Sequence, residues 1–354
     1  MSSTIRAWTF THGGYPSSIS LATLPSPTSP PNPTTIHIRP HAIALNPVDI
    51  QLINLPFWSM PLLTRVFPAL PAPKGIAADL AGTVVAAGNN SGFAVGDSVF
   101  GIAFTPTTGT AQELVEVDVG EGGKGTASAV ILKKPEEWSW EQGAGLPLVW
   151  LTARKCVKEV EGWVGKKSGK GKSDEGRVVV LGGSSATGMY AVWLARKRGW
   201  SVLATCSGRN AEFVRGMGAE VVVDYTVEKV PEEVRRWGPD AVIDCVGGTE
   251  CVGIANRYVT IVGDKTSRLT MGGAALYLTS PTMYLRWALG KAGLGSSYDC
   301  VNLEFNKEFL EEALTLPKDK IAIDSVWEFE QLMEAFERLN TGRARGKVIV
   351  KVAE

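Results

Sequence analysis

The sequence predicts an α/β protein with a parallel sheet in its second half and an irregular, mostly antiparallel β region in its first half. From residue 177 onwards, short β-branched runs alternate with helical segments, which is typical of βαβ units around a parallel sheet. Thirteen of the 20 prolines lie before residue 74. Since proline fixes φ and removes a backbone donor, that region cannot be rich in long helices.

Length and composition narrow the class of protein. At about 150 residues per domain, 354 residues indicate roughly two domains. Lys+Arg and Asp+Glu are both 36, and this balance does not favour a nucleic-acid partner. The longest uncharged apolar region, 269–285, is interrupted by glycines and a proline, so we expect no membrane span. Five cysteines without a CxxC pair, and an N-terminus without signal-peptide features, predict a cytoplasmic protein with reduced thiols.

The first half is predicted to contain short strands separated by turns. Glycine- and asparagine-rich turn residues occupy 88–92, and another turn is expected at 95–97. The strands are expected at 34–39, 82–87, 97–104 and 111–119.

The second half begins with a predicted helix over 141–160, with a break at 145–147. The Gly- and Lys-rich stretch 162–176 is interpreted as a surface loop. Strands are then expected at 177–181, 201–205, 220–223, 240–245 and 257–262, and helices at 187–198, 210–217 and 227–237. The chain is expected to close with helices at 307–316 and 328–339 and a strand at 347–352.

The strongest motif is a buried strand that runs straight into a glycine-rich turn and a helix. Small residues there let the backbone approach a pyrophosphate, and the start of the helix offers free N–H groups and a positive dipole end. The alternative is a tight turn that binds no ligand. The turn comprises Gly182, Gly183, Ser184, Ser185, Ala186, Thr187 and Gly188.

The end of the next strand predicts which nicotinamide cofactor is used. NAD sites usually place an acidic residue there to bind the ribose hydroxyls, whereas residues 205–210 contain no acid. Ser207, Arg209 and Asn210 could instead accept a 2′-phosphate, so we predict NADPH. The alternative for Arg209 is a solvated arginine at the start of a helix.

Several blocks of sequence resemble the medium-chain dehydrogenase/reductase superfamily, specifically its zinc-independent quinone oxidoreductase branch. The similar blocks are ALNPVD (44–49), IAADLAGTVVAAG (76–88), FAVGDSVFG (93–101), GAGLPLVWLTA (143–153), GAEVVVDYT (218–226) and RARGKVIVKV (343–352). Within that branch, GGSSATG followed by ATCSGRN is most similar to fungal members, including trans-acting enoyl reductases that serve polyketide synthases.

The resemblance implies two domains: a GroES-like catalytic domain from 1–145 and 300–354, and a Rossmann NADPH-binding domain from 146–299. It also implies cofactor contacts outside the glycine-rich turn. Those positions are Thr152, Ser207, Asn210, Tyr225, Cys245, Val246, Gly247, Ile261, Val262 and Lys347.

No metal is expected. A zinc site needs soft or borderline ligands at tetrahedral spacing. No cysteine precedes Cys156, and the histidines His12, His37 and His41 have no second ligand at a useful spacing.

Without a metal, conjugate reduction of an enone, quinone or enoyl thioester suits the predicted site. Asn46 could orient the substrate or the cofactor ribose, while Asp49 is expected to cap a helix. Lys74 and Tyr284 are candidate proton donors, since Gln51 stands where some quinone reductases carry a tyrosine.

Two segments rich in aromatic and aliphatic side chains, 55–63 and 276–287, could line a pocket for a small apolar carbonyl-conjugated substrate. Core or subunit packing is the alternative. The candidate substrate-binding residues are Gln51, Phe57, Trp58 and Tyr277.

We therefore expect an NADPH-dependent reductase of activated C=C bonds or quinones. The alternatives are a trans-acting enoyl or tailoring reductase of fungal secondary metabolism with a polyketide synthase partner, and a non-catalytic nucleotide-binding protein. A homodimer through an edge strand near 257–280 is a further expectation.

Overall fold

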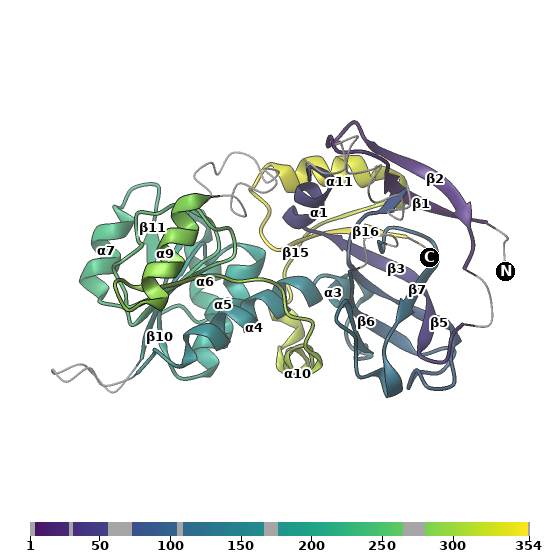
Figure 1. Cartoon of the computed structure of the whole chain (residues 1–354), viewed down its shortest axis with the longest axis horizontal. Helices are drawn as coiled ribbons and strands as arrows, with labels where there is room; N and C mark the ends of the chain where they lie inside the picture. Colours follow the sequence, from purple (N-terminus) through teal and green to yellow (C-terminus); the bar gives the residue numbers. More distant parts are fainter. Residues whose placement is uncertain are drawn as a thin grey trace. The chain divides into compact units, whose positions relative to one another are not determined.

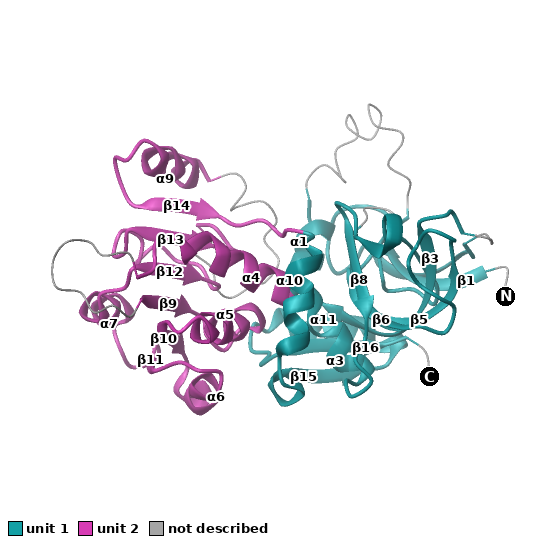
Figure 2. Cartoon of the chain, turned by 90° about the horizontal axis from the view of Figure 1, so that it is seen from below, with its two compact units in different colours: residues 1–148, 269–274, 305–354 teal, residues 149–268, 275–304 magenta. Residues whose placement is uncertain are grey.

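The computed structural model describes residues 4–27, 31–55, 73–104, 109–165, 176–264 and 280–352. The chain divides into two compact units, coloured separately in Figure 2. Unit 1 comprises residues 1–148, 269–274 and 305–354, and unit 2 comprises residues 149–268 and 275–304. The first strand, β1 (Thr4–Phe10), and the last, β16 (Lys347–Lys351), both belong to unit 1. Both strands are labelled in Figure 1.

Unit 2 contains a six-stranded sheet in the order β11-β10-β9-β12-β13-β14, and every neighbouring pair is parallel. This order is that of the Rossmann doubly wound sheet, in which the chain reverses direction across the sheet next to its first strand. The predicted parallel α/β sheet is confirmed. The strands are β9 (Arg177–Leu181), β10 (Ser201–Cys206), β11 (Val221–Asp224), β12 (Ala241–Asp244), β13 (Arg257–Thr260) and β14 (Ser297–Cys300).

The observed sheet differs from the predicted one in two ways, and residues 265–279 of the expected edge region lie outside the described residues. The strand β14 was not predicted, because SYDC at 297–300 is short and has little apolar character. Its presence places β13 inside the sheet, between β12 and β14. The edge strand expected near 257–280 is therefore not formed by residues 257–260.

The three helices predicted after strands of the unit 2 sheet are present with shifted ends, whereas the helix α9 (Pro281–Lys291) was not predicted. The predicted helix at 210–217 starts as a 3₁₀ turn, η3 (Gly208–Asn210), before α6 (Ala211–Gly216), and α7 begins at Val230 rather than at 227. Trp150 packs α4 against α5 through Tyr190 and Trp193, with ring centroids 5.6 Å apart in both pairs. The helices are α4 (Pro147–Glu161), α5 (Ala186–Lys197), α6, α7 (Val230–Trp237) and α9 (Pro281–Lys291).

Unit 1 is built mainly from antiparallel strands, as predicted. Its larger sheet runs β15-β16-β3-β5-β6-β8, with β7 also paired to β3, and only β15 and β16 are parallel. A smaller sheet runs β2-β1-β4. The strands are β1 (Thr4–Phe10), β2 (Ile19–Pro25), β3 (Thr35–Leu45), β4 (Lys74–Gly75), β5 (Asp79–Ala87), β6 (Ser98–Ala103), β7 (Val115–Asp118), β8 (Ala129–Lys133), β15 (Ile323–Trp327) and β16 (Lys347–Lys351).

β3 is longer than the predicted strand 34–39 because the chain continues through Pro40. The register between β3 and β5 shifts at Pro40, where the missing N–H interrupts the ladder. The predicted strand over 111–119 is shorter, since only Val115–Asp118 pairs.

The helices of unit 1 are short. The predicted break at 145–147 is confirmed, because α3 ends at Ala144 and α4 begins at Pro147. The two predicted C-terminal helices each combine an α segment with a 3₁₀ turn. The elements are α1 (Pro47–Ile53), η2 (Glu121–Gly123), α3 (Trp140–Ala144), α10 (Lys307–Glu312), η4 (Ala313–Thr315), η5 (Lys318–Lys320), η6 (Phe329–Gln331) and α11 (Leu332–Asn340).

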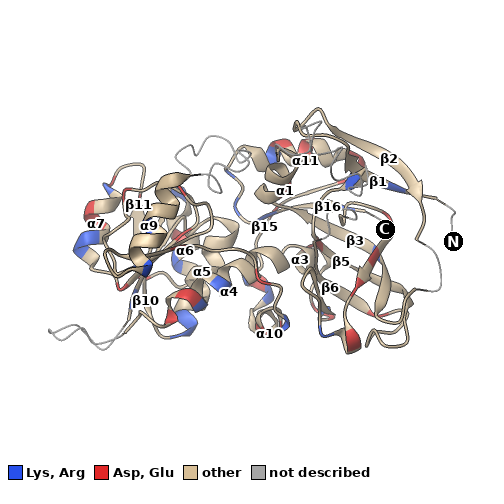
Figure 3. Ribbon diagram, in the orientation of Figure 1, with Lys and Arg blue, Asp and Glu red and all other residues tan. Residues whose placement is uncertain are grey.

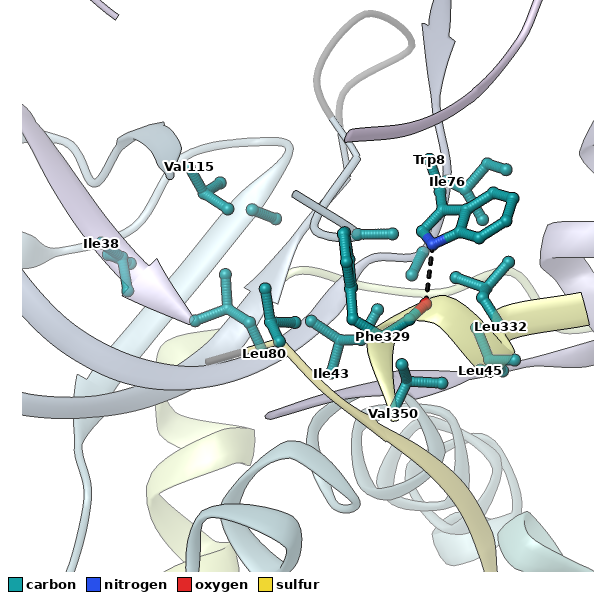
Figure 4. Packing of buried hydrophobic residues seen from close by; sticks show 14 of the residues in the cluster. Trp8, Ile38, Ile43, Leu45, Ile76, Leu80, Val115, Phe329, Leu332 and Val350 are labelled. Carbon is teal, nitrogen blue, oxygen red and sulfur yellow. Dashed lines mark hydrogen bonds between the residues drawn. The ribbon is translucent and has the colours of Figure 1, made fainter. Parts of the chain in front are cut away.

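The core of unit 1 joins residues from both ends of the chain. The Trp8 indole N–H donates to the Phe329 carbonyl oxygen over 2.8 Å, beside Leu45, Leu332 and Val350 (Figure 4). Each fully buried aliphatic side chain contributes about 1.5–3 kcal/mol relative to exposure. The C-terminal segment is therefore an integral part of this unit.

Charges of both signs are interspersed on the surface, for example along α7 and α11 (Figure 3). In the part of the chain that the structure describes, no helix is long and apolar enough to cross a membrane.

Candidate functional site

The turn between β9 and α5 is tied to β10 by Thr205. The Gly182 N–H donates to Thr205 Oγ1 over 2.9 Å, and the Gly183 N–H donates to the Thr205 carbonyl oxygen over 2.8 Å. Two of the amides in the predicted phosphate-binding turn are therefore occupied within the protein.

The glycines of this turn are required by its own packing. Gly182 has a φ of 82°, and a Cβ there would come within 3.0 Å of Val246 Cγ1. A Cβ at Gly188 would come equally close to the Gly182 carbonyl oxygen. The glycine pattern alone therefore does not distinguish a ligand-binding turn from an empty one.

The start of α5 offers unpaired backbone amides beside this turn. The Ser185 N–H donates to the Gly182 carbonyl, and Ser185 Oγ caps the helix by accepting from the Gly188 N–H over 3.0 Å. Among the described residues, the N–H groups of Ser184, Ala186 and Thr187 have no partner. With the positive end of the α5 dipole, these donors suit phosphate oxygens.

The loop after β10, residues 207–210, lies next to this turn. Asn210 Nδ2 donates to Ser184 Oγ and to Ser207 Oγ, both over 3.3 Å, and thereby links the two segments. Within the described ranges, the exposed Arg209 guanidinium has no hydrogen bond or ion pair. Tyr225, after β11, is 51% exposed. The loop thus carries hydroxyl, amide and guanidinium groups, and the 2′-phosphate site stays a prediction.

One acidic residue beside this loop was missed by the sequence analysis. Asp224 ends β11 and is paired in register with Cys206, so its carboxylate lies close to Gly208. The only signal for it in the sequence is its position at the end of a β-branched run.

The loops after β12 and β13 are joined by a second missed acid, Asp244. Its carboxylate accepts from the N–H groups of Val246 and Gly247 over 3.0 and 2.9 Å, and from Thr260 Oγ1 over 2.9 Å. Thr260 Oγ1 also accepts from the Val262 N–H over 3.2 Å. Burial raises the pKa of the Asp244 carboxyl, and these hydrogen bonds oppose that shift.

These contacts bring together five of the predicted cofactor positions in unit 2: Cys245, Val246, Gly247, Ile261 and Val262. Thr152, on α4, is buried in the same unit.

In unit 1, Asn46, Asp79 and Lys347 form a buried polar cluster. Asp79 Oδ2 accepts from Asn46 Nδ2 over 2.9 Å and from Lys347 Nζ over 3.1 Å. Lys347 Nζ also donates to Asn46 Oδ1, and Asp79 Oδ1 accepts from the Leu148 N–H over 2.8 Å. Asn46 and Lys347 were predicted separately as site residues, and in the structure both contact Asp79.

The Asn46 amide is therefore engaged within the protein on both its oxygen and its nitrogen, and none of its side chain reaches solvent. Asp49 lies next to the cluster and caps α1, as predicted, because its Oδ2 accepts from the Asn46 N–H over 2.7 Å. Burial raises the pKa of Asp49 to about 7, and nearby Lys347 opposes that shift.

Three of the remaining catalytic and substrate candidates lie on β4, α1 and α9. Lys74, on β4, is buried, and burial lowers the pKa of its ammonium group. Gln51 is half-buried on α1, and Tyr284, on α9 of unit 2, is 53% exposed. Phe57, Trp58 and Tyr277 lie outside the described residues.

The three histidines have non-metal partners or neighbours. His37 Nε2 lies 3.0 Å from Glu116 Oε2, and His41 Nε2 lies 3.0 Å from Thr83 Oγ1. His12 Nδ1 lies 3.0 Å from Thr11 Oγ1. Over the residues that the structure describes, no three His, Cys, Asp or Glu side chains are grouped as a metal site would need.

Comparison with known families gives two matches along the chain. Residues 32–140 match the family described as alcohol dehydrogenase GroES-like domain, and residues 217–350 match the family described as zinc-binding dehydrogenase. The first match lies in unit 1, and the second covers parts of both units.

Similar proteins extend over nearly the whole chain. A mouse protein named NAD(P)H oxidoreductase RTN4IP1, mitochondrial, is 28% identical over 90% of this chain and 82% of its own length. An Arabidopsis thaliana protein named chloroplast envelope quinone oxidoreductase homolog is 28% identical over 96% of both chains. The solved structure of a quinone oxidoreductase from Coxiella burnetii matches with a TM-score of 0.75 and 26% identity, over 99% of this chain and 100% of that one.

Proposed function

The chain belongs to the medium-chain dehydrogenase/reductase superfamily, and from this premise we propose that it is an NADPH-dependent, zinc-independent reductase. Its proposed substrates are small apolar molecules with an activated C=C bond, such as an enone or enoyl thioester, or a quinone. More broadly, the chain is an oxidoreductase that uses a nicotinamide cofactor.

The observation that carries the proposal is the set of free donors at the carboxyl edge of the unit 2 sheet. The amides of Ser184, Ala186 and Thr187 would hold the pyrophosphate at the start of α5. Arg209 and Ser207 would receive the 2′-phosphate, because a planar guanidinium and a hydroxyl are both phosphate donors. When bound, the cofactor supplies the hydride.

The remaining hydrogen bonds are proposed to hold residues in place and to take no part in the reaction. The Asp244–Thr260 pair would hold the loops 245–247 and 261–263 in one arrangement along the nicotinamide half. Asn46 and Lys347 are proposed to stabilise unit 1 through Asp79 and not to transfer a proton, because their polar atoms are buried and mutually bonded.

Zinc independence is supported by the donor set, since the histidines are engaged with Thr11, Glu116 and Thr83. No cysteine precedes Cys156, so the N-terminal part of unit 1 offers no thiolate for a zinc site.

The test is consumption of NADPH and of NADH by the purified protein with a panel of enones, quinones and enoyl thioesters. We expect turnover with at least one class and a preference for NADPH. Activity only with a carrier-bound acyl chain would favour the alternative of a reductase that serves a synthase. Binding of NADPH without turnover on any acceptor would contradict the proposal and favour a non-catalytic nucleotide-binding protein.

A cytoplasmic location and a homodimer are proposed with this function. Several relatives carry the word mitochondrial in their names, so fractionation of cells that express the full chain is the measurement that separates the two locations. Light scattering of the purified chain tests the dimer.

A further inference from the structure

The Asp224 carboxylate lies against the backbone of the β10 loop at Gly208. A Cβ added to Gly208 would come within 3.0 Å of Asp224 Oδ2, which is closer than side chains approach one another. Gly208 is not among the glycines with a positive φ, so its backbone conformation would accept any residue. A side chain at this position would therefore displace either the neighbouring carboxylate or the loop backbone.

The carboxylate is held in place from its other side. Asp224 Oδ1 accepts from the Thr226 N–H over 2.9 Å and from Thr226 Oγ1 over 2.7 Å. The Asp224 N–H donates to Glu228 Oε1 over 2.7 Å, and the Asp224 carbonyl oxygen accepts from the Glu228 N–H over 2.8 Å. Hydrogen bonds from Thr226, followed by one from the Gly208 N–H, lower the pKa of Asp224, so the acceptor is ionised at neutral pH.

Gly208 lies in the middle of the loop that carries the proposed phosphate donors. Ser207 precedes it and Arg209 follows it, and the Asn210 N–H closes the turn on the Ser207 carbonyl oxygen over 2.8 Å. A shift of Gly208 would therefore move the Ser207 and Arg209 side chains together.

We propose that Asp224 is a positioning residue for cofactor selection, which holds Gly208 so that Ser207 and Arg209 present their donors to the 2′-phosphate of NADPH. This inference rests on the proposed use of NADPH. Asp224 acts through the loop backbone, and no contact between it and the cofactor is assigned.

The negative charge of Asp224 and its proposed positioning role predict opposite effects on NADPH binding. As a negative charge near a phosphate, Asp224 would weaken NADPH binding, and its removal would tighten it. As a positioning residue it strengthens NADPH binding, and its removal weakens it. NADH lacks the 2′-phosphate and serves as the internal reference, because it uses the same turn without the selecting group.

The experiment measures the dissociation constants of NADPH and NADH for the full chain by titration calorimetry. The variants are Asp224→Ala, Asp224→Asn, Gly208→Ala and the double variant Gly208→Ala/Asp224→Ala. We expect Asp224→Ala and Gly208→Ala each to weaken NADPH binding by roughly ten-fold and NADH binding by less than about two-fold, with Asp224→Asn in between. The double variant should bind NADPH no more weakly than Asp224→Ala alone, because the new methyl group no longer meets a carboxylate.

Glu228→Gln is the matched control. It removes one negative charge from the same turn and keeps an oxygen acceptor for the Asp224 N–H, so the ratio of the two dissociation constants should not change. Thermal unfolding of each variant identifies any that fails to fold, and Asp224→Asn and Gly208→Ala then carry the test.

Two outcomes distinguish the positioning role of Asp224 from the proposed use of NADPH. A wild-type chain that binds NADPH and NADH equally would overturn both the proposed cofactor preference and the role of Asp224. A wild-type chain that prefers NADPH, together with Asp224 variants that keep or increase that preference, would overturn the positioning role alone.

Discussion

Thr260 Oγ1 donates a hydrogen bond to Asp244 Oδ2 over 2.9 Å and accepts one from the Val262 N–H. Asp244 ends β12, and Thr260 ends β13. One buried pair therefore sets the relative position of the two loops that leave these strands.

We expect Thr260→Val to reduce the free energy of unfolding by about 1–3 kcal/mol, because Asp244 would lose a partner in a site without access to water. Urea unfolding measures the change. Thr315→Val is the control, since the Thr315 hydroxyl bonds to a carbonyl at an exposed position and its loss should cost less than about 0.5 kcal/mol. Equal effects of the two substitutions would show that the buried pair has no special role.

Arg209→Gln should raise the KM for NADPH by roughly ten-fold while the KM for NADH stays nearly constant, because only NADPH carries the phosphate that the guanidinium would bind. Steady-state kinetics with both cofactors gives the two values. Arg215→Gln is the control, because it removes the same charge from an exposed position on α6. A parallel rise in both KM values would assign Arg209 a general role instead of a selective one.

Lys347→Met should destabilise unit 1 strongly, by about 3–5 kcal/mol, because it leaves the Asp79 carboxylate buried without its counter-charge. Thermal or urea unfolding tests this. Lys133→Met breaks the ion pair with Asp97, in which the lysine side chain is 65% exposed, and should cost at most about 1 kcal/mol. Similar losses in the two variants would contradict the assignment of the cluster as a stabilising element.

The raised pKa of Asp49 predicts that the free energy of unfolding depends on pH. Because its pKa in the folded protein is raised to about 7 from 3.8, the folded state binds a proton that the unfolded state releases between these values. The contribution of Asp49 to stability therefore decreases as the pH rises from about 4 to about 7 and is lost above the folded pKa.

The measurement is urea unfolding of the wild type and of Asp49→Asn across this range. We expect the variant to gain stability relative to the wild type as the pH rises, since its amide stays neutral and still offers an oxygen to the Asn46 N–H. Asp118→Asn, in which an exposed aspartate likewise accepts from a backbone N–H, is the control and should show no such trend. A difference between Asp49→Asn and wild type that does not vary with pH would exclude the raised pKa.

Elemental analysis of the purified chain should find no stoichiometric zinc, and treatment with a chelator should leave the reductase activity unchanged. The reason is that the described residues offer no grouped set of His, Cys, Asp and Glu ligands. One zinc per chain, or activity lost with the chelator and restored by zinc, would show that zinc independence is wrong.

Local sequence patterns predicted the parts of the fold that depend on periodicity and turn chemistry. β9 was placed at its observed bounds, and the helix over 141–160 was predicted with its break, because a β-branched run and a proline leave strong local signals. β14 left no such signal, and a contact with its neighbour β13 defines it.

The candidate site likewise has parts that could be predicted from local sequence and parts that could not. The glycine-rich turn was evident from its residues, but its free amides could not be identified, because Thr205 on the next strand occupies two of them. Asp224 and Asp244 were missed for a related reason, since an acid at a strand end looks like an ordinary turn residue until the neighbouring loop is placed beside it.

The βαβ units, the glycine-rich turn and the lack of an acid in residues 205–210 could all be predicted before folding was known, since they are properties of neighbouring residues. The meeting of Asn46, Asp79 and Lys347 is visible only in the folded chain. These residues are up to 301 positions apart, and the pairing of β16 and β5 with β3 brings them together. Such a contact depends on the energy of the whole packed unit, to which many distant residues contribute, and leaves no trace in any local pattern.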